Sequence, residues 1–321
     1  MRIAYQGEPG AYSEAAAAKY SPDATLLPCP AFDDVFQAVE AGTVTCGVLP
    51  IENSIGGTIH RNYDLLVQHE LRIVGEVELS VVHSLVALPG TSLDDLQQIY
   101  SHPQALAQCD RFLRSLSGKE VVATYDTAGS AKLIRERNLT TTGAIASERA
   151  AAVFGLAILK SGIQDYADNI TRFIVVTPGR AATEVIGAHT PNKTTVVFTL
   201  PNTPGSLFKA LSVFALREID VTKVESRPIP GRPWEYLFYL DVAVGAQESR
   251  CARALTHLAE FAPSLKTLGS YPKAQGIARQ APTGPPVHDL APTVHTVLTT
   301  STSSAASAGA DRGGSEQEAA Q

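Results

Sequence analysis

The stretch CGVLPIENSIGGTIHRNYDLLVQ, residues 46–68, contains the pattern that decides the fold. It opens with a short apolar run, Cys46–Pro50, which has the length and composition of a buried strand. A turn rich in Asn, Ser and Gly follows, and the residues after it predict a helix near 58–68. A strand, a capped turn and a helix in this order form the repeating unit of an α/β fold.

The same order recurs on both sides of this stretch. The N-terminal run Arg2–Gln6 leads through a Gly-Glu-Pro-Gly turn into a helix rich in alanine. Three later units begin with strands near residues 98–101, 121–125 and 144–146. Strands joined by crossover helices pair in parallel, so we expect a mainly parallel sheet.

Residues that cap helices stand at nearly every junction between a strand and the following helix. In open α/β sheets these junctions lie at the carboxyl ends of the strands, where ligands bind. Helix N-termini that meet in one crevice attract an anion through backbone N–H groups and partial positive charge. The pattern therefore favours a small carboxylate as ligand. The alternative is that each polar residue only caps its own helix.

A second polar segment, Asp168-Asn169-Ile170-Thr171-Arg172-Phe173, precedes the apolar strand of residues 174–176. An arginine beside a threonine can hold a carboxylate bidentately while the hydroxyl donates a hydrogen bond. The alternative reading of these residues alone is a surface arginine and an ordinary strand threonine.

Composition excludes several function classes. The 321 residues carry a net charge of −6, which gives no basic field for nucleic acid or a membrane surface. The four cysteines are widely spaced and the eight histidines show no H-x-x-x-H pair, so we expect neither disulfides nor a metal site. The G-x-G-x-x-G, G-K-[ST] and G-x-S-x-G motifs are missing, so no cofactor is expected.

The chain divides into four parts by composition. We expect an α/β domain over residues 1–178 and a linker rich in Pro and Gly over 179–193. Residues 194–272 predict the order βαββαβ, which is the ferredoxin-like split unit. The tail, 273–321, has no aromatic residue and is dominated by small and polar residues, so we expect it to be disordered.

Four separated motifs together resemble the prephenate dehydratase family. They are YQGEPGAYSEAA from Tyr5, GVLPIENSIGGTIHRNYDLL from Gly47, SHPQALAQC from Ser101 and DNITRF from Asp168. The continuous GGTIHRNYDLL form is closer to the plant-type branch, the arogenate dehydratases. PGSLFKALSVFA from Pro204 and KVESRP from Lys223 are similar to that family's ACT regulatory domain. The resemblance covers residues 2–272 and leaves the tail unmatched.

The resemblance implies a catalytic domain of two α/β lobes, similar to type II solute-binding proteins, with the active site between them. The first lobe is expected to hold residues 1–75 and the strand after Thr171, and the second residues 76–163. The implied reaction is loss of water and CO2 from prephenate, giving phenylpyruvate, or from arogenate, giving phenylalanine. The plant-type resemblance favours acceptance of arogenate without excluding prephenate.

The resemblance also implies roles for individual residues. Thr171 is expected to donate to the leaving hydroxyl, Arg172 to anchor a substrate carboxylate, and Phe173 to support the ring. The expected substrate-binding residues are Asn53, Ser54, Gly57, Gln104, Thr127 and Asn169.

For regulation, the ACT motifs imply allosteric binding of L-phenylalanine in a homodimer or homotetramer. The residues expected at that site are Gly205, Ser206, Leu207, Glu225, Ser226, Arg227 and Pro228. The expected compartment is a bacterial cytoplasm, or the plastid stroma if a transit peptide has been removed. The competing function is a non-catalytic amino-acid sensor, in which an ACT domain is joined to a domain like a solute-binding protein.

Overall fold

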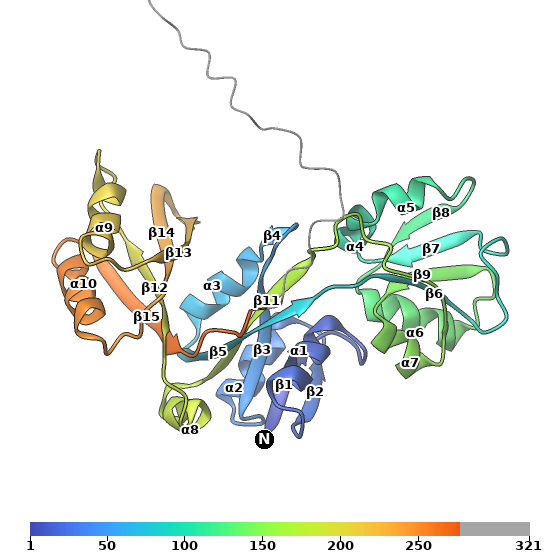
Figure 1. The fold of residues 1–321 in the computed structure, drawn as a ribbon, viewed down its shortest axis with the longest axis horizontal. Helices are drawn as coiled ribbons and strands as arrows, with labels where there is room; N and C mark the ends of the chain where they lie inside the picture. Colours follow the sequence, from blue (N-terminus) through green and yellow to red (C-terminus); the bar gives the residue numbers. More distant parts are fainter. Residues whose placement is uncertain (277–321) are drawn as a thin grey trace, which may run out of the picture. The chain divides into compact units, whose positions relative to one another are not determined.

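The computed structural model describes residues 1–276, which form two β-sheets covered by helices (Figure 1). The helices are α1 (Tyr12–Tyr20), α2 (Phe32–Glu40), α3 (His60–Gln68), α4 (Pro103–Gln108), α5 (Asp110–Arg114), α6 (Thr127–Arg137), α7 (Glu148–Phe154), α8 (Ala182–Ile186), α9 (Ser206–Ala215) and α10 (Ser249–Ala259). Within residues 1–276, no helix is both long and apolar enough to cross a membrane.

The larger sheet has ten strands and is mixed rather than mainly parallel. Its strands, in spatial order, are β13 (Val221–Ile229), β14 (Arg232–Val242), β12 (Lys193–Thr199), β15 (Ser264–Tyr271), β5 (Leu71–Ser80), β11 (Ile170–Pro178), β3 (Cys46–Asn53), β1 (Arg2–Gln6) and β2 (Thr25–Cys29), with β4 (Gly57–Thr58) paired to β3. Only β1, β2 and β3 form the expected parallel unit. β11 runs antiparallel to both of its neighbours, because it returns from the second lobe without a crossover helix.

The smaller sheet forms the second lobe. Its order is β10 (Ala157–Ser161), β6 (Ser84–Ala87), β9 (Thr142–Ala146), β7 (Gln98–Ser101) and β8 (Glu120–Ala123). β7 is parallel to β8 and β9, whereas β6 is antiparallel to β9 and β10. The chain enters this lobe after β5, which continues through Gly75 to Ser80. The boundary expected at residue 75 therefore falls inside a strand, and the chain leaves the first lobe only after Ser80.

The C-terminal part has the predicted order βαββαβ: β12, α9, β13, β14, α10 and β15. Helices α9 and α10 pack on one face of its sheet, over a buried cluster that includes Phe198, Phe214 and Leu258. On its edge, β15 pairs with β5 through Gly269 and Ile73. The regulatory-type domain thus extends the sheet of the first lobe.

The segments that follow each domain contain ordered structure. The expected linker, residues 179–193, includes a 3₁₀ turn, Gly179–Ala181, and helix α8. Val185 and Ile186 of α8 pack against a buried cluster of the first lobe. At the start of the expected tail, the Lys273 amide donates to Asn192 and the Ala274 amide to Glu76. The prediction for residues 277–321 lies outside the described residues.

The two lobes meet closely at Gly10, and substitution there tests how tight that contact is. Gly10 has φ +91°, and a Cβ would lie 2.5 Å from Cα of Ala150 in α7. Gly42 has φ +70° but open space around it. An alanine at positive φ costs roughly 1–2 kcal/mol, and overpacking adds roughly 1–3. Gly10→Ala should therefore lower the free energy of unfolding, measured in urea, clearly more than Gly42→Ala. Equal losses of unfolding free energy in the two variants would show that the lobes move apart enough to accommodate a methyl group at residue 10.

Candidate active site

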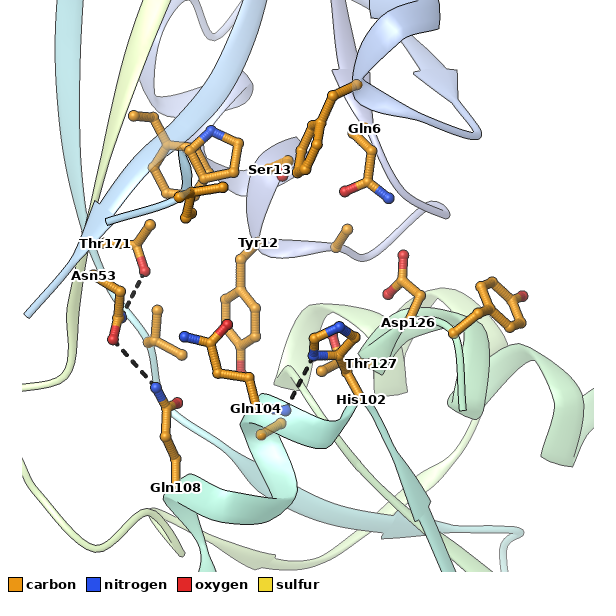
Figure 2. Close-up of a pocket in the computed structure, with 18 of the residues that line it drawn as sticks. Gln6, Tyr12, Ser13, Asn53, His102, Gln104, Gln108, Asp126, Thr127 and Thr171 are labelled. Atoms are coloured by element: carbon orange, nitrogen blue, oxygen red, sulfur yellow. Dashed lines mark hydrogen bonds between the residues drawn. The ribbon is translucent and has the colours of Figure 1, made fainter. Parts of the chain in front are cut away.

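A cavity of about 450 Å³ lies between the two lobes. Figure 2 shows residues that line it from both sides, including Tyr12, Asn53 and Thr171 from the first lobe and Gln104 and Asp126 from the second. The lining residues are Gln6, Ala11, Tyr12, Ser13, Ala31, Phe32, Asp33, Pro50, Asn53, Ile59, Val81, His83, His102, Gln104, Ala105, Gln108, Tyr125, Asp126, Thr127, Thr171 and Phe173. The first residues of α1, α2 and α6 are among them, so the expected convergence of helix N-termini on one crevice is present.

The expected site residues divide into two groups. Five of them line the cavity: Asn53, Gln104, Thr127, Thr171 and Phe173. The other four lie beside it or behind it: Ser54, Gly57, Asn169 and Arg172. The second group shapes the site without facing its interior, as the contacts below show.

Arg172 does not face the cavity, which corrects its expected role as carboxylate anchor. Successive strand residues point to opposite faces, so Thr171 and Phe173 face the cavity while Arg172 points away. Its guanidinium lies 2.6 Å from Asp241 and 3.2 Å from Glu76. Burial disfavours the charged guanidinium, but these carboxylates outweigh that effect and raise the pKa of Arg172 well above its usual range. Arg172 therefore joins the two domains.

The Asn53 side chain orients Thr171. Its Oδ1 accepts hydrogen bonds from the amides of Ile55 and Gly56, at 3.0 and 2.6 Å, which fixes the orientation of the side-chain amide. Its Nδ2 then donates to Thr171 Oγ1 at 3.0 Å and to Asn169 Oδ1 at 2.7 Å. Because Thr171 Oγ1 accepts from Asn53, its own hydrogen is available to donate toward the cavity.

Gln108 continues this network into the second lobe. Its Nε2 donates to Asn53 Oδ1 at 3.2 Å, and its Oε1 accepts from Asn169 Nδ2 at 2.8 Å. The same Oε1 lies 2.9 Å from His83 Nε2, so this nitrogen must carry the hydrogen. Burial lowers the pKa of His83, although the hydrogen bond to Gln108 opposes the shift.

Tyr12, in the first lobe, also joins this network through His83. Its hydroxyl lies 3.0 Å from His83 Nδ1 and 2.7 Å from the carbonyl of Val82. Tyr12, His83 and Gln108 were not predicted as site residues. A signal for Gln108 was present, since it follows Gln104 by four residues and lies on the same face of α4. Tyr12 lies inside the YQGEPGAYSEAA motif, whereas His83 lies outside all four motifs and carries no such signal.

Ser54 and Asn169 hold the segment before β11 against the end of β3. Ser54 Oγ donates to the carbonyl of Asp168 at 2.8 Å and accepts from the Ile170 amide at 2.9 Å. Asn169 is fully buried between Asn53 and Gln108. Gly57 has φ +77°, which suits glycine at the turn into β4. These residues position the Asn53 turn and do not themselves face the cavity.

The residues expected to bind phenylalanine lie on two elements. Gly205, Ser206 and Leu207 form the start of α9, and Gly205 has φ +82°. The remaining four lie on β13: Glu225, Ser226, Arg227 and Pro228.

The two charged residues of the E-S-R-P motif, Glu225 and Arg227, contact the first lobe. Glu225 accepts from Thr58 Oγ1 at 2.7 Å and lies 3.1 Å from His60 Nε2. Burial opposes ionisation of Glu225, but these hydrogen bonds and Lys223 lower its pKa overall. Arg227 pairs with Asp64 at 2.9 Å. The E-S-R-P motif is therefore also part of the contact between the domains.

Comparison with known proteins places both parts of the chain. The prephenate dehydratase family model matches residues 3–181, and the ACT domain model matches residues 194–250. The chain is 50% identical over 282 residues to arogenate dehydratase/prephenate dehydratase 2, chloroplastic, of Arabidopsis thaliana, covering 85% of this chain and 73% of the relative.

Two solved structures are similar over most of the chain. Prephenate dehydratase from Arthrobacter aurescens in complex with L-Phe has 34% identity and a TM-score of 0.76, covering 84% of this chain and 89% of that one. A protein described as a novel type of quorum quenching acylase has 36% identity and a TM-score of 0.77, covering 85% of this chain and 98% of that one.

The buried contact of Asp241 with Arg172 gives a pH-dependent prediction. Burial raises the pKa of Asp241, but Arg172, Lys193 and a hydrogen bond from Thr195 outweigh this and lower the pKa overall. Asp241→Asn leaves buried positive charge uncompensated, which should cost about 3–5 kcal/mol of unfolding free energy at pH 7. A lowered pKa stabilises the fold above the ordinary carboxyl pKa, so the difference from wild type should shrink below about pH 4.

Urea unfolding between pH 7 and pH 3 measures this difference. Asp23→Asn, at an exposed carboxylate, is the matched control and should change stability by less than about 0.5 kcal/mol. A loss in Asp241→Asn that is the same at every pH would contradict the assignment of a lowered pKa.

Proposed function

The chain belongs to the prephenate dehydratase family and is a decarboxylating dehydratase of phenylalanine biosynthesis; we propose that Thr171 is its catalytic hydrogen-bond donor. The single observation that supports this role is the hydrogen bond from Asn53 to Thr171 Oγ1 inside the cavity. It occupies the acceptor side of the hydroxyl and leaves the donor side for a substrate.

The reaction needs a hydrogen-bond donor at one position only, beside the departing ring hydroxyl. The bond between the ring and its carboxylate breaks, and its electron pair moves into the ring as CO2 leaves. At the opposite ring carbon the hydroxyl departs with its bonding pair and takes up a proton from solvent to form water. A hydrogen bond from Thr171 to this oxygen stabilises the developing negative charge. Help of this kind contributes on the order of 10²–10⁴ to the rate.

Because Arg172 faces away from the cavity, the carboxylate of the substrate side chain binds instead at a helix N-terminus. Helix α1 starts at the cavity, and no side chain caps it at Ala11. Its first N–H groups are therefore available to an anion, with the partial positive charge of the helix end behind them. Gln104 and Thr127 line the cavity from the second lobe and supply further polar contacts. Phe173, almost fully buried beneath the site, supports the ring-binding surface.

The alternatives have less support. A non-catalytic sensor does not require a threonine whose donor side is directed into the cavity. The quorum quenching acylase is less similar to this chain than the plant dehydratase is, with 36% against 50% sequence identity. Dehydratase turnover of arogenate or prephenate distinguishes these readings.

We also propose that L-phenylalanine regulates the enzyme through the C-terminal domain, in a homodimer or homotetramer. The similar Arthrobacter structure is a complex with L-Phe, and the ACT family model matches this domain. Glu225 provides a route to the active site, because it bonds to Thr58, which lies just beyond the Asn53 turn. The chloroplastic name of the Arabidopsis relative supports the plastid stroma as the compartment.

Thr171→Ala should lower kcat by about 10²–10⁴ on whichever substrate the enzyme accepts, because the donor is removed. Thr171→Ser keeps the hydroxyl and should retain most of the activity. The measurement is steady-state kinetics on purified protein, with circular dichroism to confirm folding. If folded Thr171→Ala keeps more than about a tenth of the wild-type kcat, the assignment of Thr171 is wrong.

Thr58→Val tests the regulatory route. If phenylalanine competes with the first lobe for Glu225, removal of the Thr58 hydrogen bond should lower the half-maximal phenylalanine concentration by about tenfold. Thr256→Val, on the exposed side of α10, is the control and should leave that concentration unchanged. An unchanged or higher value for Thr58→Val would show that the contact does not oppose phenylalanine.

A further inference from the structure

The charges around the cavity are unusual for a site that binds anions. Among the lining residues of the described chain, neither lysine nor arginine occurs. Two aspartates line it instead, Asp33 and Asp126. Prephenate carries two carboxylates, whereas arogenate carries the same two carboxylates and an ammonium group. A cavity lined by two aspartates, and by neither lysine nor arginine, favours the substrate that has a cation.

The two aspartates differ in what they already bind. Asp33 pairs with the guanidinium of Arg61, and its side chain is 41% exposed. For Asp126, the structure shows no ion pair among residues 1–276. Its Oδ1 caps α6 by accepting from the Ala128 amide at 2.8 Å. Its Oδ2 has only a long 3.4 Å contact with the Glu8 amide, so this oxygen can accept another hydrogen bond.

The position of Asp126 fits one end of the substrate. Figure 2 shows the Asp126 carboxylate and the Thr171 hydroxyl on opposite sides of the cavity. In arogenate the hydroxyl and the amino-acid side chain are attached to opposite carbons of the ring. With the hydroxyl at Thr171, the side chain therefore extends toward Asp126. The carboxylate of that side chain meets the start of α1, and its ammonium meets Asp126.

We propose that Asp126 is the residue that selects arogenate over prephenate, by accepting a hydrogen bond from the substrate ammonium. This inference rests on the proposed function and on the role of Thr171 in it. The keto oxygen of prephenate cannot donate a hydrogen bond, so it would leave the Asp126 carboxylate facing an acceptor. A site built to pair with a donor discriminates against the analogue that lacks it.

Asp126→Asn tests the proposal, because asparagine caps a helix about as well as aspartate, while the charge is removed and an NH2 donor takes the place of the free carboxylate oxygen. The values of kcat/KM are measured for arogenate and prephenate on the full chain. Wild type should prefer arogenate, and Asp126→Asn should lower the arogenate-to-prephenate ratio by about tenfold or more, mainly through KM for arogenate. Asp33→Asn removes one negative charge from the same cavity and should change the ratio by less than about twofold.

Each outcome decides a separate point. An equal loss on both substrates in Asp126→Asn, or a wild type that prefers prephenate, would overturn the selection by Asp126. The same change of ratio in Asp33→Asn would overturn it too, because cavity charge in general would then be responsible. If wild type turns over neither substrate, the proposed function fails, whatever the aspartates do.

Discussion

The buried ion pair between Arg172 and Asp241, at 2.6 Å, constrains the rest of the structure. Glu76 and Lys193 join it, with the Lys193 ammonium 2.8 Å from the Glu76 carboxylate. Buried charges must remain paired, so β11, β5, β12 and β14 are held in fixed register around this cluster. Because Arg172 points into the cluster, its neighbours Thr171 and Phe173 must point the other way, into the cavity. The interface between the domains thus determines the orientation of β11.

On the cavity side of β11, neutral side-chain amides hold Thr171 in position. Asn53, Asn169 and Gln108 bond to one another, and together they satisfy nearly all of their donors and acceptors without charge. A neutral network suits a reaction in which one carboxylate must leave as CO2, since a cation beside that group would stabilise the starting material. Gln108 belongs to the second lobe and Asn53 to the first, so the network also depends on how the lobes close.

The regulatory-type domain touches the catalytic lobe along one face of the active-site strands, where the Arg172 guanidinium lies 3.4 Å from the Glu52 carboxylate. Asp241 reaches Arg172, which is adjacent to Thr171 in the sequence. Glu225 and Lys223 reach Thr58 and Glu52, which flank the Asn53 turn. A change at the E-S-R-P motif therefore acts on the two segments that place the Thr171 hydroxyl. Such contacts provide two physical routes for coupling, which requires two states of different affinity for the effector.

The sequence by itself determined the local elements: short apolar runs, capped turns and helical spacing gave the α/β lobes and the βαββαβ domain. The family resemblance also pointed to Thr171 and Asn53, and both line the cavity. The tertiary structure alone decided that Arg172 faces the other domain, that β11 runs antiparallel, and that Tyr12, His83 and Asp126 share one cavity. Periodicity describes one strand or helix at a time, whereas the face that a side chain occupies depends on which strands pair and in which register.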